Sequence, residues 1–277
     1  MKLYGLIGYP LGHSFSKNYF TQKFEKEQLK CRFENFAIED ITLLPAILQN
    51  NPSLLGLCVT IPYKQKVISF LHELSSEVQQ IGACNSIRIS NGKLTGFNTD
   101  TIGFKQSLMR QLQPYHTKAL ILGTGGASKA VEYVLQQLGI AYTLVSRSAG
   151  EGSMRYEMLS EEVIKNHLLI INASPVGTFP DINKCPAIPY EAVGSRHFLF
   201  DLIYNPEKTL FLKQGLERGA AVQNGHDMLI AQAGQGDVRS ADGAIHSTID
   251  VAMQRTVERV MASYLHARAN IGLRNAS

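Results

Sequence analysis

The sequence predicts an α/β protein with two sheets, and three observations support this prediction. Strand-like apolar runs alternate with helix-like segments along the chain, which is the pattern of mainly parallel sheets. A glycine-rich turn at residues 123–126 follows one such run and opens a helix-like segment, as in a doubly wound sheet. The length of 277 residues exceeds the roughly 100–200 residues of one ordinary domain. We therefore expect two α/β domains, the second of Rossmann type.

The first half supplies the elements of one mainly parallel sheet. Asn91 and Gly92 predict a two-residue hairpin turn, because both central positions of that turn need positive φ. The hairpin places an antiparallel pair at one edge of the sheet. In chain order we expect strand 2–8, helix 15–29, strand 31–38, helix 41–49, strand 54–60, two short helices within 64–80, strands 84–90 and 93–97, and helix 100–112.

The second half reads as one series of βα units, which predicts a single doubly wound sheet. Its expected elements are strand 119–122, helix 127–138, strand 141–146, helix 156–165, strands 167–172 and 197–203, helix 207–217 and strand 220–224. Beyond Ala233 a Gly/Asp/Ser-rich stretch intervenes. Apolar residues then recur at steps of three and four between Ile249 and Tyr264, which predicts an amphipathic helix for core packing or a subunit interface.

Composition excludes several classes of protein. The apolar fraction of 44% and the charged fraction of 18% fit a globular chain. A net charge of +4 without a Lys/Arg run gives no reason to expect nucleic acid, and no segment is apolar enough for a membrane span. The four cysteines have no metal or redox spacing, so we expect reduced thiols, no metal site and a cytoplasmic protein: Cys31, Cys58, Cys84 and Cys185.

A nucleotide-binding turn is the most specific local motif. Gly123, Gly125 and Ser128 occupy the three small-residue positions of a dinucleotide fingerprint, with Gly126 and Ala127 between them. There the backbone can approach a pyrophosphate, and the helix N-terminus stabilises its charge. The alternative is an ordinary tight turn between strand and helix. The strand before it, the helix after it and the next strand favour nucleotide binding.

The end of the strand 141–146 indicates which nucleotide binds. A carboxylate is expected here for a ribose 2′-hydroxyl, but the chain has Ser146, Arg147 and Ser148. A guanidinium suits a 2′-phosphate, because it donates two parallel hydrogen bonds. Arg147 therefore favours NADP as the nucleotide. The alternative is a solvated arginine on the surface.

Polar residues also follow the strands of the first half, where open α/β sheets place their ligands. Ser14 and Ser16 either cap a helix or bind a small carboxylate. Lys64 follows a strand end, and Asp100 either caps the next helix or meets this lysine as a proton-transfer pair. Asn85 offers a donor and an acceptor to a polyol. The default site is a cleft between the two domains.

Together these segments resemble the shikimate dehydrogenase family, and the resemblance extends from Leu3 to about Ala233. Eight motifs occur in family order, which makes the resemblance specific although each is weak alone. They are Gly8-x-Pro10 with His13-Ser14-x-Ser16, Val59-Thr60-x-Pro62-x-Lys64, Ala83-x-Asn85, Gly96-x-Asn98-Thr99-Asp100, Gly123-x-Gly125-Gly126-Ala127-Ser128, Asn172-Ala173-Ser174-Pro175-x-Gly177, Asp201-x-x-Tyr204-x-Pro206, and Gly225-x-x-Met228-Leu229-x-x-Gln232-Ala233.

The resemblance implies reversible NADPH-dependent reduction of 3-dehydroshikimate to shikimate, with Lys64 as the acid/base group and Asp100 as its partner. It implies that Ser14 and Ser16 hold the substrate carboxylate. The residues around the ring hydroxyls would be Thr60, Asn85, Asp100, Tyr204 and Gln232. The residues that bind NADP would be Gly123, Gly125, Gly126, Ala127, Ser128, Ser146, Arg147, Ser148 and Gly225.

The domain boundaries follow from the order of the motifs. We expect a substrate-binding domain over 1–102, an NADP-binding domain over 103–224, and a C-terminal segment over 225–277 that returns to the first domain. The chain departs from the family at Lys17, at Tyr19-Phe20, at Cys58, at Ser146-Arg147-Ser148, which replaces Asn-Arg-Thr, and after Ala233. Two alternatives remain, a quinate/shikimate dehydrogenase that uses NAD and a nonenzymatic nucleotide-binding paralogue. The expected assembly is a monomer or a homodimer.

Overall fold

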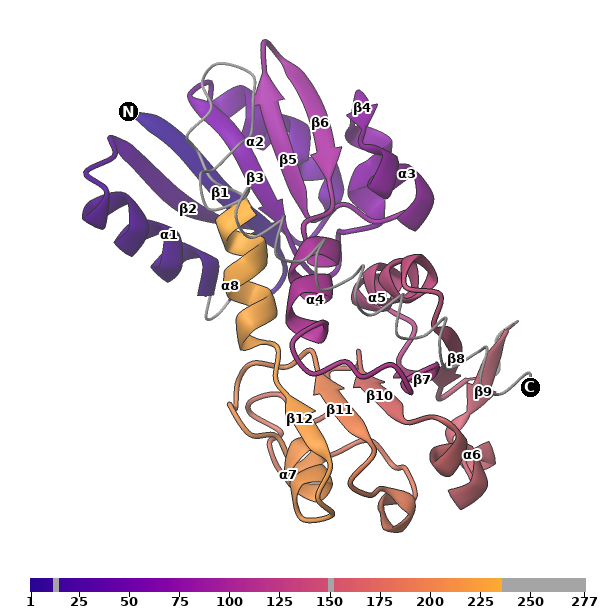
Figure 1. Ribbon diagram of the computed structural model, residues 1–277. Coiled ribbons are helices and arrows are strands. Elements are labelled where there is room, and N and C mark those ends of the chain that lie inside the picture. The colour runs from indigo at the N-terminus through magenta and orange to yellow at the C-terminus, as the bar shows by residue number, and fades with distance from the viewer. Residues whose placement is uncertain (12–14, 149–151, 236–277) are drawn as a thin grey trace. The chain divides into compact units, whose positions relative to one another are not determined.

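The computed structural model describes residues 1–11, 15–148 and 152–235, which belong to two compact units (Figure 1). The first unit is Met1–Thr99, and the second begins at Asp100. The predicted amphipathic helix between Ile249 and Tyr264 lies outside the described residues. Within the described ranges, no helix has the length and apolar character needed to cross a membrane.

The first unit contains a mixed six-stranded sheet with the strand order β2-β1-β3-β5-β6-β4. β1 is parallel to β2 and β3, whereas β5 is antiparallel to β3 and β6. Asn91 and Gly92 have φ values of 49° and 74°, which confirms the hairpin. The hairpin is not outermost, because the short β4 pairs with β6. The strands are β1 (Lys2–Gly8), β2 (Cys31–Ala37), β3 (Leu54–Val59), β4 (Glu73–Leu74), β5 (Ser86–Ser90) and β6 (Lys93–Phe97).

Short helices supply the apolar residues that cover this sheet. Leu44, Val67 and Val78 pack with strand residues such as Leu57 into one buried cluster. On α1, Phe20 stacks on Phe33 of β2 at a centroid distance of 4.9 Å. The helical elements of the first unit are α1 (Phe15–Lys26), η1 (Ile41–Leu43), α2 (Leu44–Asn50), η2 (Lys66–Phe70) and α3 (Ser76–Ile81).

The helix predicted over 41–49 is two elements instead of one. The side chain of Asp40 accepts a hydrogen bond from Thr42 N at 2.8 Å and caps the first, η1. Pro45 then lies in the first turn of α2, where the absence of an N–H costs nothing. The helix predicted over 15–29 was also too long, since α1 ends at Lys26 and Gln28 has φ 55°.

The second unit is the predicted doubly wound sheet, with six parallel strands in the order β12-β11-β10-β7-β8-β9. The chain moves outward from β7 in one direction through β8 and β9, and in the other through β10, β11 and β12 (Figure 1). The strands are β7 (Lys118–Leu122), β8 (Ala141–Ser146), β9 (Ser153–Arg155), β10 (Leu169–Asn172), β11 (Phe198–Asp201) and β12 (Ala221–Gln223).

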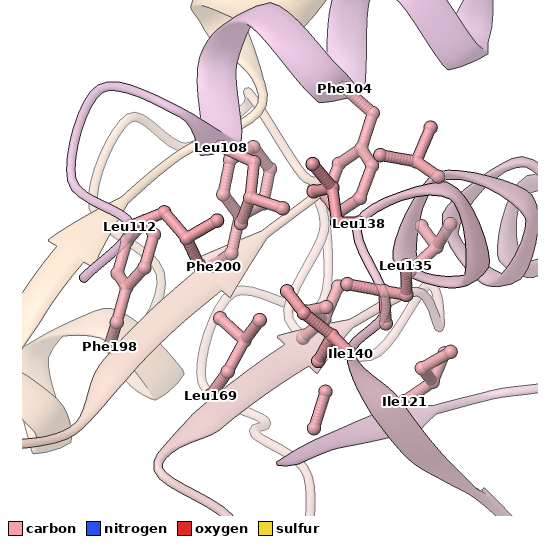
Figure 2. Packing of buried hydrophobic residues seen from close by; sticks show 14 of the residues in the cluster. Phe104, Leu108, Leu112, Ile121, Leu135, Leu138, Ile140, Leu169, Phe198 and Phe200 are labelled. Carbon is pink, nitrogen blue, oxygen red and sulfur yellow. The ribbon is translucent and has the colours of Figure 1, made fainter. Parts of the chain in front are cut away.

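Alternate residues of these strands are buried on opposite faces of the sheet, as strand geometry requires. Ile121 joins the cluster on the face of α4, α5 and α8, in which Phe104 and Phe200 meet edge to face at 5.1 Å (Figure 2). Leu120 joins the other cluster with Phe211 of α7. The helical elements of the second unit are α4 (Asp100–Leu108), α5 (Gly126–Gln137), η3 (Tyr156–Met158), α6 (Glu161–Asn166), η4 (Tyr190–Ala192), α7 (Leu210–Leu216) and α8 (His226–Gln235).

Several predicted boundaries in this unit were wrong. The helix predicted over 207–217 is α7 over Leu210–Leu216, and the strand predicted over 197–203 ends at Asp201. The segment predicted as one helix over 156–165 is η3 followed by α6, because the side chain of Ser160 accepts a hydrogen bond from Val163 N and starts a new helix. The strand β9 before η3 was not predicted. The helix predicted over 100–112 ends at Leu108.

Candidate active site

The C-terminal ends of β1 and β3 lie side by side in the first unit. Thr60 N donates to Ile7 O at 3.0 Å, and Tyr9 N donates to Ile61 O at 3.0 Å. A Cβ at Gly8 would collide with the side chain of Thr60, so a glycine is needed for this close approach. Thr60 is therefore fixed at the edge of the sheet where ligands of parallel strands bind.

The backbone of Lys64 is tied to the chain that leads into β5. Cys84 N donates to Lys64 O at 2.7 Å, and Val59 N donates to Asn85 O at 2.8 Å. Lys64 is half-buried and Asn85 is buried. The structure thus brings together Thr60, Lys64 and Asn85 at the C-terminal ends of β1 and β3, although they come from different segments.

Asn85 also holds the end of the first unit in place. Its Oδ1 accepts hydrogen bonds from Thr99 N at 2.8 Å and Thr99 Oγ1 at 3.3 Å, and its Nδ2 is 3.1 Å from Thr99 Oγ1. Asn98 Nδ2 donates to Ala83 O at 2.9 Å beside it. Asn85, which is predicted to bind the substrate, therefore also has a structural role, since it fixes Thr99 directly before Asp100.

The other predicted residues of the substrate site are placed only in part. Ser14 lies outside the described residues, and Ser16 is in the first turn of α1. Asp100 is the first residue of α4 and is buried. Lys64 belongs to the first unit and Asp100 to the second, so their pairing, like the cleft between the domains, stays a prediction.

The glycine-rich turn has the geometry of a pyrophosphate-binding loop. Gly123 has φ 117°, and a Cβ there would lie 3.1 Å from backbone atoms of Ala173 and Ser174. A Cβ on Gly125 would meet nothing within 4 Å, and the following residue, Gly126, begins α5. Because Gly123 and Ala173 follow β7 and β10, where the strand order reverses, this is the switch point at which doubly wound sheets bind ligands.

Ser128, which replaces the third glycine of the fingerprint, is fully buried in the first turn of α5. Its Oγ donates to Gly125 O at 2.6 Å and its backbone N donates to the same oxygen at 3.0 Å. The Ser128 hydroxyl therefore stabilises the turn through a hydrogen bond within the loop. Ala127, beside it, is half-buried. These features fit the dinucleotide loop that the sequence predicts.

A buried polar network supports the second loop at the switch point. Asn172 Oδ1 accepts from Ser174 N at 3.1 Å and Ser174 Oγ at 2.6 Å, while Asn172 Nδ2 donates to Asp201 Oδ1 at 3.0 Å. Asp201 also accepts from Ile203 N at 3.0 Å and Thr209 Oγ1 at 2.6 Å. Burial raises the pKa of Asp201 to about 7, although these three hydrogen bonds oppose the shift.

Sequence reasoning assigned no role to Asn172 or Asp201, although both are in family-like motifs. The available signal was their position, since each is a polar residue at the end of an otherwise apolar strand. Neither side chain is exposed to solvent. We therefore interpret them as supports for the loops at the switch point.

The chain after β11 brings Tyr204 near Gly225. Gly225 N donates to Ile203 O at 3.0 Å, and a Cβ at Gly225 would collide with Leu202 O. Tyr204, next to Ile203, is 38% exposed, and burial of its ring raises its pKa. Gln232 lies in α8.

The residues predicted for the 2′-phosphate follow β8. Ser146 is its last residue and is half-buried, whereas Arg147 and Ser148 are exposed. Ser148 N donates to Ser146 Oγ at 3.4 Å, which curves the chain at this strand end. This segment is separate from the glycine-rich turn but ends a strand adjacent to it in the sheet.

Comparison with known proteins identifies relatives over most of the chain. Residues 6–87 match the shikimate dehydrogenase substrate binding domain. The shikimate dehydrogenase (NADP(+)) of Syntrophomonas wolfei is 38% identical over 251 residues, which cover 83% of this chain and 86% of the relative. That of Methanococcus vannielii is 32% identical over 250 residues, covering 83% and 88%.

Solved structures agree with these relatives. Shikimate dehydrogenase from Aquifex aeolicus has a TM-score of 0.78 and 28% identity, covering 93% of this chain and 97% of that one. Shikimate 5-dehydrogenase from Thermus thermophilus, in complex with NADP(H) and shikimate, has a TM-score of 0.77 and 28% identity, covering 94% and 100%. The chain therefore belongs to the shikimate dehydrogenase family.

Proposed function

We propose that this protein is an NADP-dependent shikimate dehydrogenase, which reversibly reduces 3-dehydroshikimate to shikimate in aromatic amino acid biosynthesis. The observation that carries the proposal is the meeting of Thr60, Lys64 and Asn85 at the strand ends of a unit that matches the family's substrate binding domain. The relatives from S. wolfei and M. vannielii are shikimate dehydrogenases that use NADP(+), which supports the same cofactor here.

The substrate is a cyclohexene carboxylate that carries hydroxyl groups. Ser14 and Ser16, before and in the first turn of α1, hold the carboxylate through neutral donors. Neutral donors suffice because hydrogen bonds to a charged acceptor are about twice as strong as neutral ones. The ring hydroxyls contact residues that offer both donors and acceptors, namely Thr60, Asn85, Asp100, Tyr204 and Gln232.

Lys64 moves the proton of the reaction. During reduction its ammonium group donates a proton to the substrate's carbonyl oxygen, and in the reverse direction the amine removes the hydroxyl proton. The hydrogen bond from Cys84 N fixes the backbone of Lys64, so only its side chain has to be ordered. The carboxylate of Asp100 orients the amine.

The second unit binds the cofactor. Gly123, Gly125, Gly126, Ala127 and Ser128 form the loop at the N-terminus of α5, whose N–H groups favour a pyrophosphate. Gly225 allows the chain to lie against the end of β11 beside this site. The 2′-phosphate contacts Ser146, Arg147 and Ser148. When bound, NADPH supplies the hydride, and the protein aligns the two reacting carbons.

The proposed organisation has a substrate-binding domain over 1–102, an NADP-binding domain over 103–224, and a segment over 225–277 that returns to the first domain. In the described part of the chain the four cysteines are thiols and not disulfides, which is compatible with a cytoplasmic enzyme. A monomer or a homodimer is the expected assembly.

The test is shikimate-dependent formation of NADPH by the purified full-length chain, followed by absorbance. We expect turnover with shikimate and NADP, and much less with NAD or without shikimate. Preferred use of NAD would refute the role of Arg147. A chain that binds NADP but does not turn over shikimate would be a nonenzymatic nucleotide-binding protein, and this result would refute the proposal.

A further inference from the structure

The edge strand β9 brings a second arginine to the end of β8. β9 runs parallel to β8, and its register pairs Val145 with Met154 and Ser146 with Arg155. Neighbouring strands lie about 4.8 Å apart, and paired residues direct their side chains to the same face. The side chain of Arg155 therefore starts beside that of Ser146, one residue from Arg147.

The direction of this side chain follows from the residues around it. Val145 belongs to the cluster of α6 and α7, and Met154 packs against that cluster. Because side chains alternate along a strand, Ser146 and Arg155 point to the opposite face. Leu144, on that same face, packs against the cluster that contains α5. Arg155 is thus on the face of the sheet where α5 presents its N-terminus.

Arg147 follows Ser146 directly, where β8 ends. Burial raises the pKa of Tyr156, and the positive charge of Arg147 opposes this shift. Arg147 and Arg155 are both exposed. In the part of the chain that the structure describes, neither guanidinium has a carboxylate within 4.0 Å. Two arginines at the C-terminal ends of adjacent parallel strands therefore place positive charge at this end of the sheet.

We propose that Arg155 is a specificity-determining residue, which together with Arg147 and Ser146 binds the 2′-phosphate of NADP. The inference rests on the proposed function and extends its cofactor site. A phosphate monoester carries about −1.5 to −2 charges at pH 7, which one guanidinium neutralises only in part. Two guanidinium groups match that charge and its three oxygens. The ribose 2′-hydroxyl of NAD has neither this negative charge nor these three oxygens.

The test measures binding without catalysis. Calorimetry gives dissociation constants for NADP, NAD and 2′-AMP with the parent protein and with Arg155→Ala, Arg155→Lys and Arg147→Ala. We expect Arg155→Ala to weaken the binding of NADP and 2′-AMP about 10- to 100-fold, the usual effect of losing hydrogen bonds to a charged group. The affinity for NAD should change less than about twofold. Arg155→Lys keeps the charge but loses the planar fork, so its affinity should be intermediate.

The matched control is Arg196→Ala. Arg196 lies over the ring of Tyr115 at 4.9 Å and precedes β11, which is on the other side of β7 in the same sheet. This variant loses the same charge from the same unit, so its affinity for NADP should equal that of the parent. An equal loss in this control would mean that net charge acts at long range, and would overturn the inference.

Phosphorus NMR of bound 2′-AMP gives an independent measurement. Two nearby guanidinium groups should lower the pKa of the bound phosphate below its ordinary value of about 6, and Arg155→Ala should raise it toward that value. If Arg155→Ala kept parental affinity while Arg147→Ala lost it, the inference would fall and the proposed function would stand. If the parent did not prefer NADP to NAD, the proposed cofactor would fall as well.

Discussion

The carboxyl group of Asp201, buried at the end of β11, should make the stability of the second unit depend on pH. Its Oδ1 accepts hydrogen bonds from Asn172 and Ile203, and its Oδ2 is 2.6 Å from Thr209 Oγ1. Burial raises its pKa from 3.8 to about 7. The folded state therefore favours the neutral acid. The ionised carboxylate accepts a hydrogen bond from Thr209 Oγ1, whereas the neutral acid donates its proton to that oxygen.

The sign and the size of the effect follow from this shift. A folded-state pKa above the unfolded one contributes stability that is complete below about pH 4 and is lost as pH rises to about 7. The difference between 3.8 and about 7 corresponds to about 4 kcal/mol. We expect the unfolding free energy of the second unit to fall by up to this amount over that range.

The informative perturbation is Asp201→Asn, because the amide keeps the shape of the acid and does not ionise. Its oxygen can accept from Asn172 and Ile203, and its NH₂ can donate to Thr209. This variant should equal the parent near pH 4 and exceed it near pH 8. By contrast, Asp201→Ala removes the partner of the hydrogen bonds with Asn172, Ile203 and Thr209 and should cost about 3 kcal/mol or more at every pH.

The assay is urea denaturation at a series of pH values, followed by far-UV circular dichroism. Hydrogen exchange of β11 and α7 assigns the transition to the second unit. Other carboxyl groups titrate in both proteins, so the difference between the parent and Asp201→Asn isolates this one group. A difference that stays constant from about pH 4.5 to pH 8 would show that Asp201 does not cause the pH dependence.

Three further predictions concern the two proposed sites. Lys64→Ala should lower kcat by about 10²- to 10⁴-fold with a modest change in KM; steady-state kinetics with shikimate and NADP tests this, and unchanged turnover would remove the lysine from its role. Gly123→Ala should weaken NADP binding at least about tenfold, because φ 117° and the contact with Ala173 exclude a side chain; calorimetry tests this, and parental affinity would contradict it. Asn85→Ala should lower the unfolding free energy of the first unit by about 2 kcal/mol, since its hydrogen bonds to Thr99 are lost; a denaturation midpoint equal to that of the parent would exclude this structural role.

Local sequence signals predicted most elements but not every boundary. The hairpin at Asn91 and Gly92 was predictable because few residues tolerate positive φ. The split between η3 and α6 was predictable in principle, since Ser160 precedes two glutamates as a helix cap does. The strand β9 was not, because three residues give no periodicity, and its existence depends on pairing with β8.

The same distinction applies to the sites. The motif Gly123-x-Gly125 and the family-like order of the segments are enough to identify the nucleotide loop and the candidate substrate residues from the sequence. The roles of Asn172 and Asp201 were not assigned, because their hydrogen bonds join strands that are separated by many residues in the chain. A polar residue in an apolar strand indicates only that a partner exists.

Propensity, apolar periodicity and motif spacing are local properties, so they were enough to predict the doubly wound sheet, the dinucleotide turn and the family-like set of polar residues. The folded chain was needed to show that Thr60, Lys64 and Asn85 meet at the strand ends and that Arg155 lies beside Ser146. Strand order and register depend on backbone hydrogen bonds and side-chain packing between segments that are distant in the chain. A shift of one residue in the register of β9 would turn Arg155 to the other face of the sheet.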